Sequence, residues 1–287
     1  MNTSNYTVIS FPGLGIEINP IRAIEIGPFS IQLYGVMIAL GLMLAFIYGT
    51  RRGKEFGIKN DDIIDGVLWI VPFAVICTRL YYCAFQWDSY KDNLIRILYI
   101  WEGGLAIYGG VIGAAIGIIV FCRIKKLRIG AVLDITSLGF LIGQSIGRWG
   151  NFFNREAFGE ETNSILRMGL LNSRNGNVTY YHPTFLYESL WNAAGFILLH
   201  FLSKKRKYDG QVALLYVAWY GLGRTFIEGL RMDSLYWGKV RVSQMLAAIS
   251  CFIAVALLMY FQFFKRPDPS KMQVHVLEAE EAAKKEK

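Results

Sequence analysis

The sequence is poor in charge and in the residues that bind metals. Charged residues make up 18% of its 287 positions, whereas a soluble domain usually carries about 25%. The four cysteines and three histidines show neither a CxxC pair nor the Cys/His spacing of a metal site. These shortages argue against a soluble metalloenzyme, and we expect the cysteines to pack as small apolar side chains.

We expect no cleavable signal peptide, because residues 1–28 lack a basic start followed by an apolar core. We expect the first strong apolar run to act as its own membrane anchor. The net charge of +8 is compatible with binding to nucleic acid. However, the basic residues cluster between apolar runs instead of covering one polar face. We therefore expect the lipid bilayer as a partner and no nucleic acid.

Apolar residues are abundant, at 54% of the chain. They gather in seven segments long enough to cross a bilayer, at residues 31–49, 63–85, 105–122, 131–147, 185–202, 211–230 and 242–264. Clusters of Lys and Arg follow the first, third, fifth and seventh segments. By the positive-inside rule, the N-terminus then lies outside and the C-terminus in the cytoplasm. The sequence thus predicts an all-α integral membrane protein with seven transmembrane helices.

The same pattern divides the chain into three parts. Residues 1–29 are an extracytoplasmic N-terminal arm, residues 30–264 the seven-helix membrane domain, and residues 265–287 a charged cytoplasmic tail. A polar insert at residues 149–183 interrupts the membrane domain and predicts a small extracytoplasmic head or lid. The tail is expected to be either helical or disordered.

Glycine recurs at every fourth position in two predicted helices, at Gly109, Gly113 and Gly117 and at Gly139, Gly143 and Gly147. This spacing places each set on one helix face and permits close helix packing. We expect the third and fourth helices to form a tight core through these faces.

The most polar stretch at a predicted membrane boundary is residues 147–156, Gly-Arg-Trp-Gly-Asn-Phe-Phe-Asn-Arg-Glu. Arg148 and Arg155, together with the amides of Asn151 and Asn154, suit an anionic group such as a phosphate. Glu156 either positions a nucleophile or neutralises an arginine. From local chemistry alone, an interfacial loop with a structural ion pair explains these residues equally well.

A second polar group lies inside the sixth predicted helix. Tyr220, Arg224 and Glu228 are spaced by four and share one helix face, and Arg231 follows three residues later. An ion pair joining two helices is the structural explanation, and an anion site near the outer leaflet is the functional one. The outer ends of other predicted helices carry further polar or Gly-rich elements: Tyr34-Gly35, Trp101 to Gly104, Tyr108 to Gly110, His182-Pro183 and Tyr187-Glu188.

With these motifs, the chain resembles the prolipoprotein diacylglyceryl transferase family from about Tyr34 to Phe264. The stretch at residues 147–156 resembles the family signature, and the other elements follow in the same order, with Arg79-Leu80 among them. This family transfers the diacylglyceryl group of phosphatidylglycerol to the lipobox cysteine thiol in the signal peptide of a bacterial prolipoprotein. A thioether forms and glycerol phosphate leaves, which is the first step of lipoprotein maturation.

The resemblance implies a seven-helix, multi-pass protein of the bacterial plasma (inner) membrane, with its active site towards the outer face. It carries the family's functional residues to these positions: Tyr34, Arg148, Asn151, Glu156, Gly159, Tyr220, Arg224 and Glu228. Arg148 and Arg224 are expected to bind the phosphate and stabilise its departing charge. Glu156 and Glu228 are expected to orient the arginines, and one of them could accept the thiol proton.

Substrate binding is expected to involve Asn151, Asn154, Gly159, Tyr34 and Tyr220 in addition to Arg148. Tyr108 stands where some members of the family have a histidine, so it either performs the acid–base role or orients the substrate. Neither a metal nor an organic cofactor is expected, because the substrate brings its own nucleophile and a good leaving group.

Two other classes of function fit part of the pattern. A transporter would use the polar residues to bind a small anion, but no inverted repeat is visible. A membrane scaffold would explain the small-residue helix faces but not the clustered Arg, Asn and Glu. Without the family resemblance, enzyme and transporter rank about equally.

Overall fold

The computed structural model describes residues 6–27, 29–232, 234, 236–238 and 240–285. The chain forms two compact units, which are described separately. The first unit comprises residues 1–47, 136–207 and 211–267, and the second comprises residues 48–135, 208–210 and 268–287. Two of the boundaries between the units fall inside helices α1 and α4.

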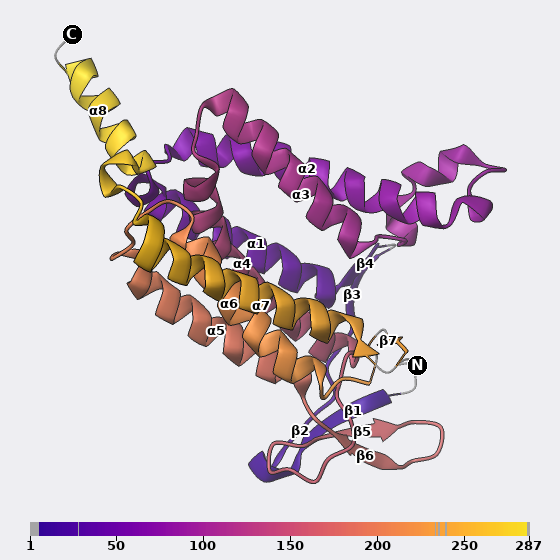
Figure 1. Cartoon of the computed structure of the whole chain (residues 1–287). Coiled ribbons are helices and arrows are strands. Elements are labelled where there is room, and N and C mark those ends of the chain that lie inside the picture. The colour runs from indigo at the N-terminus through magenta and orange to yellow at the C-terminus, as the bar shows by residue number, and fades with distance from the viewer. Residues whose placement is uncertain (1–5, 28, 233, 235, 239, 286–287) are drawn as a thin grey trace. The chain divides into compact units, whose positions relative to one another are not determined.

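The helices are α1 Leu33–Arg52, α2 Asn60–Phe85, α3 Ile107–Lys125, α4 Ile129–Asn154, α5 Thr184–Ser203, α6 Gln211–Glu228, α7 Val242–Tyr260 and α8 Gln273–Lys285 (Figure 1). The strands are β1 Tyr6–Phe11, β2 Ile16–Ile18, β3 Ala23–Ile26, β4 Phe29–Gln32, β5 Met168–Asn172, β6 Val178–Tyr181, β7 Tyr236–Trp237 and β8 Val240–Arg241. Short 3-10 helices occupy Pro12–Leu14, Gly53–Phe56, Trp87–Ser89, Leu94–Leu98, Ile100–Glu102 and Pro269–Lys271, and a π-helical turn, Phe261–Lys265, extends α7.

Among the described residues, six helices are long and apolar enough to cross a membrane: Leu33–Phe56, Asn60–Phe85, Ile107–Lys125, Ile129–Asn154, Thr184–Ser203 and Val242–Lys265. They coincide with six of the seven predicted spans. Helix α6 forms where the sequence predicts the remaining span, but Arg224 and Glu228 make it less apolar. The chain is therefore a mostly helical membrane protein. The prediction of an all-α fold is too narrow, because the polar segments form strands.

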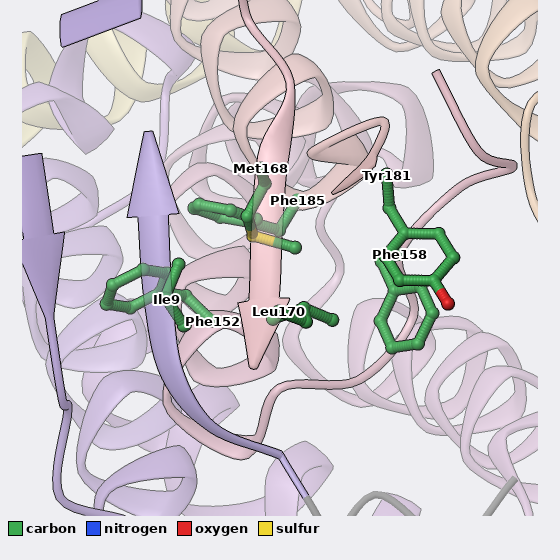
Figure 2. Close-up of a cluster of buried hydrophobic side chains, with 7 residues drawn as sticks. All are labelled: Ile9, Phe152, Phe158, Met168, Leu170, Tyr181 and Phe185. Carbon is green, nitrogen blue, oxygen red and sulfur yellow. The ribbon is translucent and has the colours of Figure 1, made fainter. Parts of the chain in front are cut away.

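In the first unit, the N-terminal arm and the polar insert form one antiparallel sheet with strand order β2-β1-β5-β6. Ile9 of β1 is paired with Leu170 of β5, although the two lie far apart in the sequence. Figure 2 shows the buried cluster that joins this sheet to α4 and α5: Ile9, Phe152, Phe158, Met168, Leu170, Tyr181 and Phe185. Burying each large apolar side chain contributes about 1.5–3 kcal/mol, so this cluster anchors the sheet to the helix ends.

The glycine face of α3 is a packing face, but its partner is α2 and not the fourth predicted helix. In the second unit, α3 lies along α2, and a Cβ added at Gly113 would come within 2.6 Å of the Cβ of Cys77. In the first unit, a Cβ added at Gly41 of α1 would lie 3.1 Å from the Cα of Gly143 on α4. The glycines of α3 therefore permit close contact with α2. Between α1 and α4 the tight position is Gly41, whereas a Cβ added at Gly143 or Gly147 would meet nothing within 4 Å.

Helices α5, α6 and α7 lie side by side in the first unit (Figure 1). Trp191 of α5 stacks on Trp219 of α6 with 4.4 Å between ring centroids. Each indole N–H donates to the backbone carbonyl of the other tryptophan at 3.0 Å. The rings occupy the space above Gly223 and Gly195, where any larger residue would clash. This reciprocal contact fixes the antiparallel register of α5 and α6.

The charged tail is helical, which resolves the two alternatives that the sequence leaves open. Its first residue in α8, Gln273, is buried and donates its backbone N–H to Asp209 at 2.8 Å. The side-chain oxygen of Gln273 accepts the backbone N–H of Arg128 at 3.0 Å. Further along α8, Glu280 pairs with Lys59 at 3.0 Å. The tail thus packs against the loops of the second unit.

Candidate active site

The polar motif at residues 147–156 begins on a helix and not in a loop. The sequence predicts that the helix ends at Gly147 and that the head starts at residue 149, but α4 continues through Asn154. Trp149 and Phe152 explain the extension, because both pack on Phe185 of α5 with ring centroids 5.5 and 5.2 Å away. The motif is therefore carried by the end of α4 and held in place by α5.

The end of α4 is closed by a Schellman motif. Glu156 donates its backbone N–H to Asn151 at 3.0 Å and Arg155 donates its own to Phe152 at 3.1 Å. The Glu156 carboxylate then accepts the side-chain amides of Asn151 and Asn154 at 3.1 and 3.2 Å. In the contacts described for Glu156, the partners are these amides and not an arginine. The structure thus gives no support to Glu156 as a group that orients arginines.

Arg155 fastens the N-terminal arm and does not join an anion site. Its φ of 55° lies in the left-handed region, where glycine usually terminates a helix. The buried guanidinium donates to Thr7 O at 3.0 Å, Phe153 O at 3.3 Å, Pro20 O at 2.5 Å and Asn19 Oδ1 at 3.0 Å. Burial, and then the charge of Arg22, lower the pKa of Arg155. One of the motif's two arginines is therefore structural.

One buried carboxylate collects three arginines from three segments. Glu188 of α5 lies 2.5 Å from Arg148 of α4, with Oε2 facing Nη2. Its other oxygen lies 3.0 Å from Nη1 of Arg224 on α6 and 3.2 Å from Nη1 of Arg231, which follows α6. Glu188 thus holds together guanidinium groups that would otherwise repel one another.

A second buried carboxylate completes this charge cluster, which we define as Arg148, Glu188, Arg224, Glu228 and Arg231. Glu228 lies one turn beyond Arg224 and 2.6 Å from its Nη2, so Arg224 bridges both carboxylates. The side chains of Arg148 and Arg224 are 23% and 17% exposed, against 4% and 2% for the carboxylates. The positively charged arginines are therefore the more exposed groups of the cluster.

Glu228 accepts further hydrogen bonds, at its carboxylate and at its backbone carbonyl. Ser234 donates its hydroxyl to Glu228 Oε1 at 2.9 Å. Arg241 donates to the backbone carbonyl of Glu228 at 2.7 Å and pairs with Glu160 at 2.9 Å. These contacts fix the C-terminal end of α6, where the charge cluster lies.

The fold positions the cluster through the tryptophan pair on α5 and α6. Glu188 lies one turn before Trp191, and Arg224 lies just over one turn beyond Trp219. Because the helices run antiparallel, the fixed register brings the two charged residues together. Two serines tie α4 to α5 in a similar way, because Ser145 and Ser189 each donate to the other's backbone carbonyl, at 2.9 and 2.8 Å.

Gly159 supports the cluster by permitting a close approach of backbones. It donates its N–H to His182 O at 2.9 Å and pairs with Arg231 in an isolated β-bridge. A Cβ at this position would lie 2.7 Å from the carbonyl oxygen of Leu230 and 2.8 Å from the Cβ of His182. The predicted substrate-binding glycine thus sets the path of the segment that carries Arg231.

Two predicted tyrosines lie in the same unit as the cluster. Half-buried Tyr34 packs on Gly150, where an added Cβ would be 2.6 Å from Cδ2 of its ring. Gly150 follows Arg148 by two residues. Tyr220 lies one turn before Arg224 and stacks on Tyr216, with 5.8 Å between ring centroids. Both rings therefore flank the helix turns that carry the arginines.

Tyr108 belongs to the second unit, so its distance from the cluster is not defined. It is an exposed residue in the first turn of α3. The chain before α3 is held by buried Arg79, which donates to Arg96 O at 2.7 Å, Ile97 O at 2.9 Å, Gly103 O at 2.6 Å and Gly104 O at 3.1 Å. Arg79 is thus a structural residue that fixes the Gly-rich approach to Tyr108.

The sequence motifs include Glu188 and Arg231 but do not indicate a role for either residue. A carboxylate in an apolar span is a strong signal, because an ionised group there needs a partner. The partners come from α4, α6 and the segment after α6, and that convergence depends on tertiary packing.

The chemistry of the cluster suits an anion. Arginine offers planar, paired donors that match the oxygens of a phosphate or carboxylate. Within the described parts of the chain, there is no group of three or more His, Cys, Asp or Glu that could hold a metal ion.

The chain matches the family model described as prolipoprotein diacylglyceryl transferase over residues 21–260. The phosphatidylglycerol–prolipoprotein diacylglyceryl transferase of Listeria welshimeri is 41% identical over 262 residues, covering 89% of this chain and 94% of that protein. Proteins of the same name from Ligilactobacillus salivarius and Limosilactobacillus reuteri are each 43% identical over 258 and 254 residues. These matches cover 87% and 86% of this chain, and 95% and 92% of the two relatives.

Proposed function

Because the chain belongs to the prolipoprotein diacylglyceryl transferase family, we infer that it transfers the diacylglyceryl group of phosphatidylglycerol to a cysteine thiol of a bacterial prolipoprotein. This reaction forms a thioether and releases glycerol phosphate in lipoprotein maturation. The acceptor that we propose is the lipobox cysteine of the precursor's signal peptide.

We propose that the charge cluster binds the phosphate of phosphatidylglycerol. The observation that carries this proposal is that Arg148 and Arg224 stay partly exposed while the two carboxylates that hold them are buried. A guanidinium has five N–H donors, and the contacts described for Arg148 use only Nη2. Arg148 therefore retains donors for phosphate oxygens while Glu188 holds it in place.

The same charges favour the departure of the leaving group. The thiolate sulfur forms a bond to the primary glycerol carbon, and the C–O bond to phosphate breaks with its electron pair on oxygen. The phosphodiester carries one negative charge and the released phosphate monoester approaches two, so negative charge grows at the arginines during the reaction. Removing one preorganised donor to such a charge typically costs about 100- to 1000-fold in kcat.

The thiol proton must pass to a base before or during attack. Glu188 and Glu228 are already committed to arginines, whereas Glu156 is held by neutral amides at the end of α4. We therefore propose Glu156 as the proton acceptor, with Asn151 and Asn154 orienting it. Tyr108 is the alternative, and its role depends on how the second unit meets the first.

The remaining proposals concern the membrane. We propose that α6 crosses as well, because ion pairing offsets much of the cost of Arg224 and Glu228, which lie towards its end. Basic residues at the ends of α1 and α3 then mark the cytoplasmic side of the bacterial inner membrane. The charge cluster faces the outer side in this arrangement, below the extracytoplasmic head.

Transfer is tested with purified protein in detergent, phosphatidylglycerol and a lipobox peptide, by peptide mass and by released glycerol phosphate. We expect one diacylglyceryl mass gain per peptide with a matching amount of glycerol phosphate. A peptide with serine in place of cysteine should gain nothing. A folded protein that produces no gain would contradict the transferase assignment and favour transport of an anionic solute.

A further inference from the structure

The β3–β4 hairpin has two faces of opposite polarity. Ile24 is paired with Ile31 and Ile26 with Phe29, so all four large apolar side chains point to one face. They are between 42% and 71% exposed, and Phe29 is the most exposed of them. Such a contiguous exposed apolar face is unusual on a surface that meets only water.

The opposite face satisfies its own polar groups. Ser30 donates its hydroxyl to Glu25 at 2.8 Å, and Gln32 donates its side-chain amide to Ser30 at 3.2 Å. Glu25 and Ser30 are directly paired across the two strands. The polar face is therefore suited to headgroups and water, whereas the apolar face requires a different environment.

The hairpin is a sheet of two strands that no other described strand joins. Such a hairpin alone is marginally stable in water, so something must cover its apolar face. Strand β4 leads directly into α1, and the backbone N–H of Leu33 donates to Arg22 O at 2.9 Å, which ties the base of the hairpin to the helix start. Helix α1 exposes Ile38 and Leu42 as a membrane-crossing helix does.

We propose that the apolar face of the β3–β4 hairpin inserts into the lipid bilayer at the boundary between headgroups and acyl chains. The occupant is lipid because β4 leads directly into α1, which is long and apolar enough to cross a membrane and exposes Ile38 and Leu42. Elements with one apolar and one polar face lie in the plane of this interface, with the apolar side in the acyl region. The hairpin thereby fixes the depth at which α1 begins.

The insertion has a consequence for the site, which rests on the proposed function. Tyr34 lies in the first turn of α1 and packs on Gly150, two residues from Arg148. A hairpin that holds the start of α1 at headgroup level therefore holds Arg148 near the depth of lipid phosphates. Insertion itself does not depend on the reaction, so its test can succeed or fail independently.

Depth is measured with a nitroxide on Phe29→Cys and, as a matched control, on its neighbour Ser30→Cys of the opposite face. Both are made with the four native cysteines replaced by alanine and reconstituted in vesicles of phosphatidylcholine and phosphatidylglycerol. Collisions with oxygen report lipid, and collisions with a nickel chelate report water. We expect position 29 to be oxygen-accessible and nickel-protected, and position 30 to show the reverse preference.

Equal nickel access at both positions would overturn the proposal. Protection of position 29 from both probes would also overturn it, because a protein then covers the face; dipolar broadening between labels would identify that protein as a second copy. If the cysteine-free protein does not fold, Phe29→Trp and Ser30→Trp in the native background replace the labels. Brominated lipid should then quench added fluorescence at position 29 only, and equal quenching would contradict insertion.

Discussion

Arg224 Nη1 lies 3.0 Å from Glu188 Oε1, although the two residues are 36 positions apart and belong to different helices. The stacked pair Trp191 and Trp219 sets the helix register that makes this contact possible. Because Glu188 also holds Arg148 and Arg231, its charge determines the positions of three cations. We therefore expect activity to depend on Glu188 as strongly as it depends on the arginines.

Replacing Glu188 by glutamine keeps the shape of the side chain and removes its charge. We expect kcat/KM to fall by about 100-fold or more, because unpaired arginines separate and lose their preorganisation. Removing one partner of a buried ion pair also costs about 3–5 kcal/mol of stability, so thermal unfolding should be followed in parallel. Wild-type kinetics in a folded Glu188→Gln protein would contradict the organising role of this carboxylate.

Substitution of an arginine in the charge cluster should reduce activity, whereas substitution of an arginine elsewhere should not. Arg148→Ala and Arg224→Ala are expected to abolish measurable transfer while membrane insertion stays intact, and Arg231→Lys should retain partial activity because it preserves the charge. Exposed Arg174, in the turn between β5 and β6, is the matched control. Arg174→Ala should react at the wild-type rate. Near-normal activity in both alanine variants of the cluster would rule out the phosphate-binding proposal.

Arg155 should behave as a structural residue in spite of its place in the motif. Arg155→Ala loses the bonds to the N-terminal arm and is expected to cost about 1–3 kcal/mol of stability. Arg155→Gly loses the same bonds but relieves the left-handed backbone at φ 55°, by about 1 kcal/mol. The glycine variant should therefore melt at the higher temperature of the two, with normal activity per folded molecule. Equal melting temperatures, or a selective loss of kcat, would contradict this assignment.

The proton acceptor is tested by comparing Glu156→Gln with Tyr108→Phe. If Glu156 takes the thiol proton, Glu156→Gln should lower kcat by about 100- to 10,000-fold, with KM for the peptide little changed. Tyr108→Phe should stay within about tenfold of wild type, which corresponds to about 1.4 kcal/mol. A large loss of kcat in Tyr108→Phe with full activity in Glu156→Gln would transfer the role to the phenol.

Features of the fold that depend on composition and on short repeats in the sequence could be predicted from the sequence. The apolar runs predict the spans, and the spacing of Gly109 and Gly113 predicts a packing face. The partner of that face was not predictable, because α1, α2 and α4 offer similar apolar surfaces. The sheet was missed because β1 and β5 pair over a long separation in sequence.

The candidate site was predictable in its residues but not in its connections. The motif and the stripe on α6 identify Arg148, Arg224 and Glu228 by residue type and spacing. The separate tasks of Arg148 and Arg155 depend on the left-handed turn that ends α4, where glycine would be the expected signal. The place of Glu188 at the centre depends on the helix register, which no local pattern encodes.

We propose above that the charge cluster binds the phosphate that leaves. The most direct test is the equilibrium binding of glycerol phosphate to purified protein, measured by calorimetry for wild type, Arg224→Ala and the control Arg174→Ala. We expect the dissociation constant to rise by about tenfold or more in Arg224→Ala, equivalent to about 1.4 kcal/mol or more, and to be unchanged in the control. Unchanged binding in a folded Arg224→Ala protein would show that the charge cluster does not bind the phosphate.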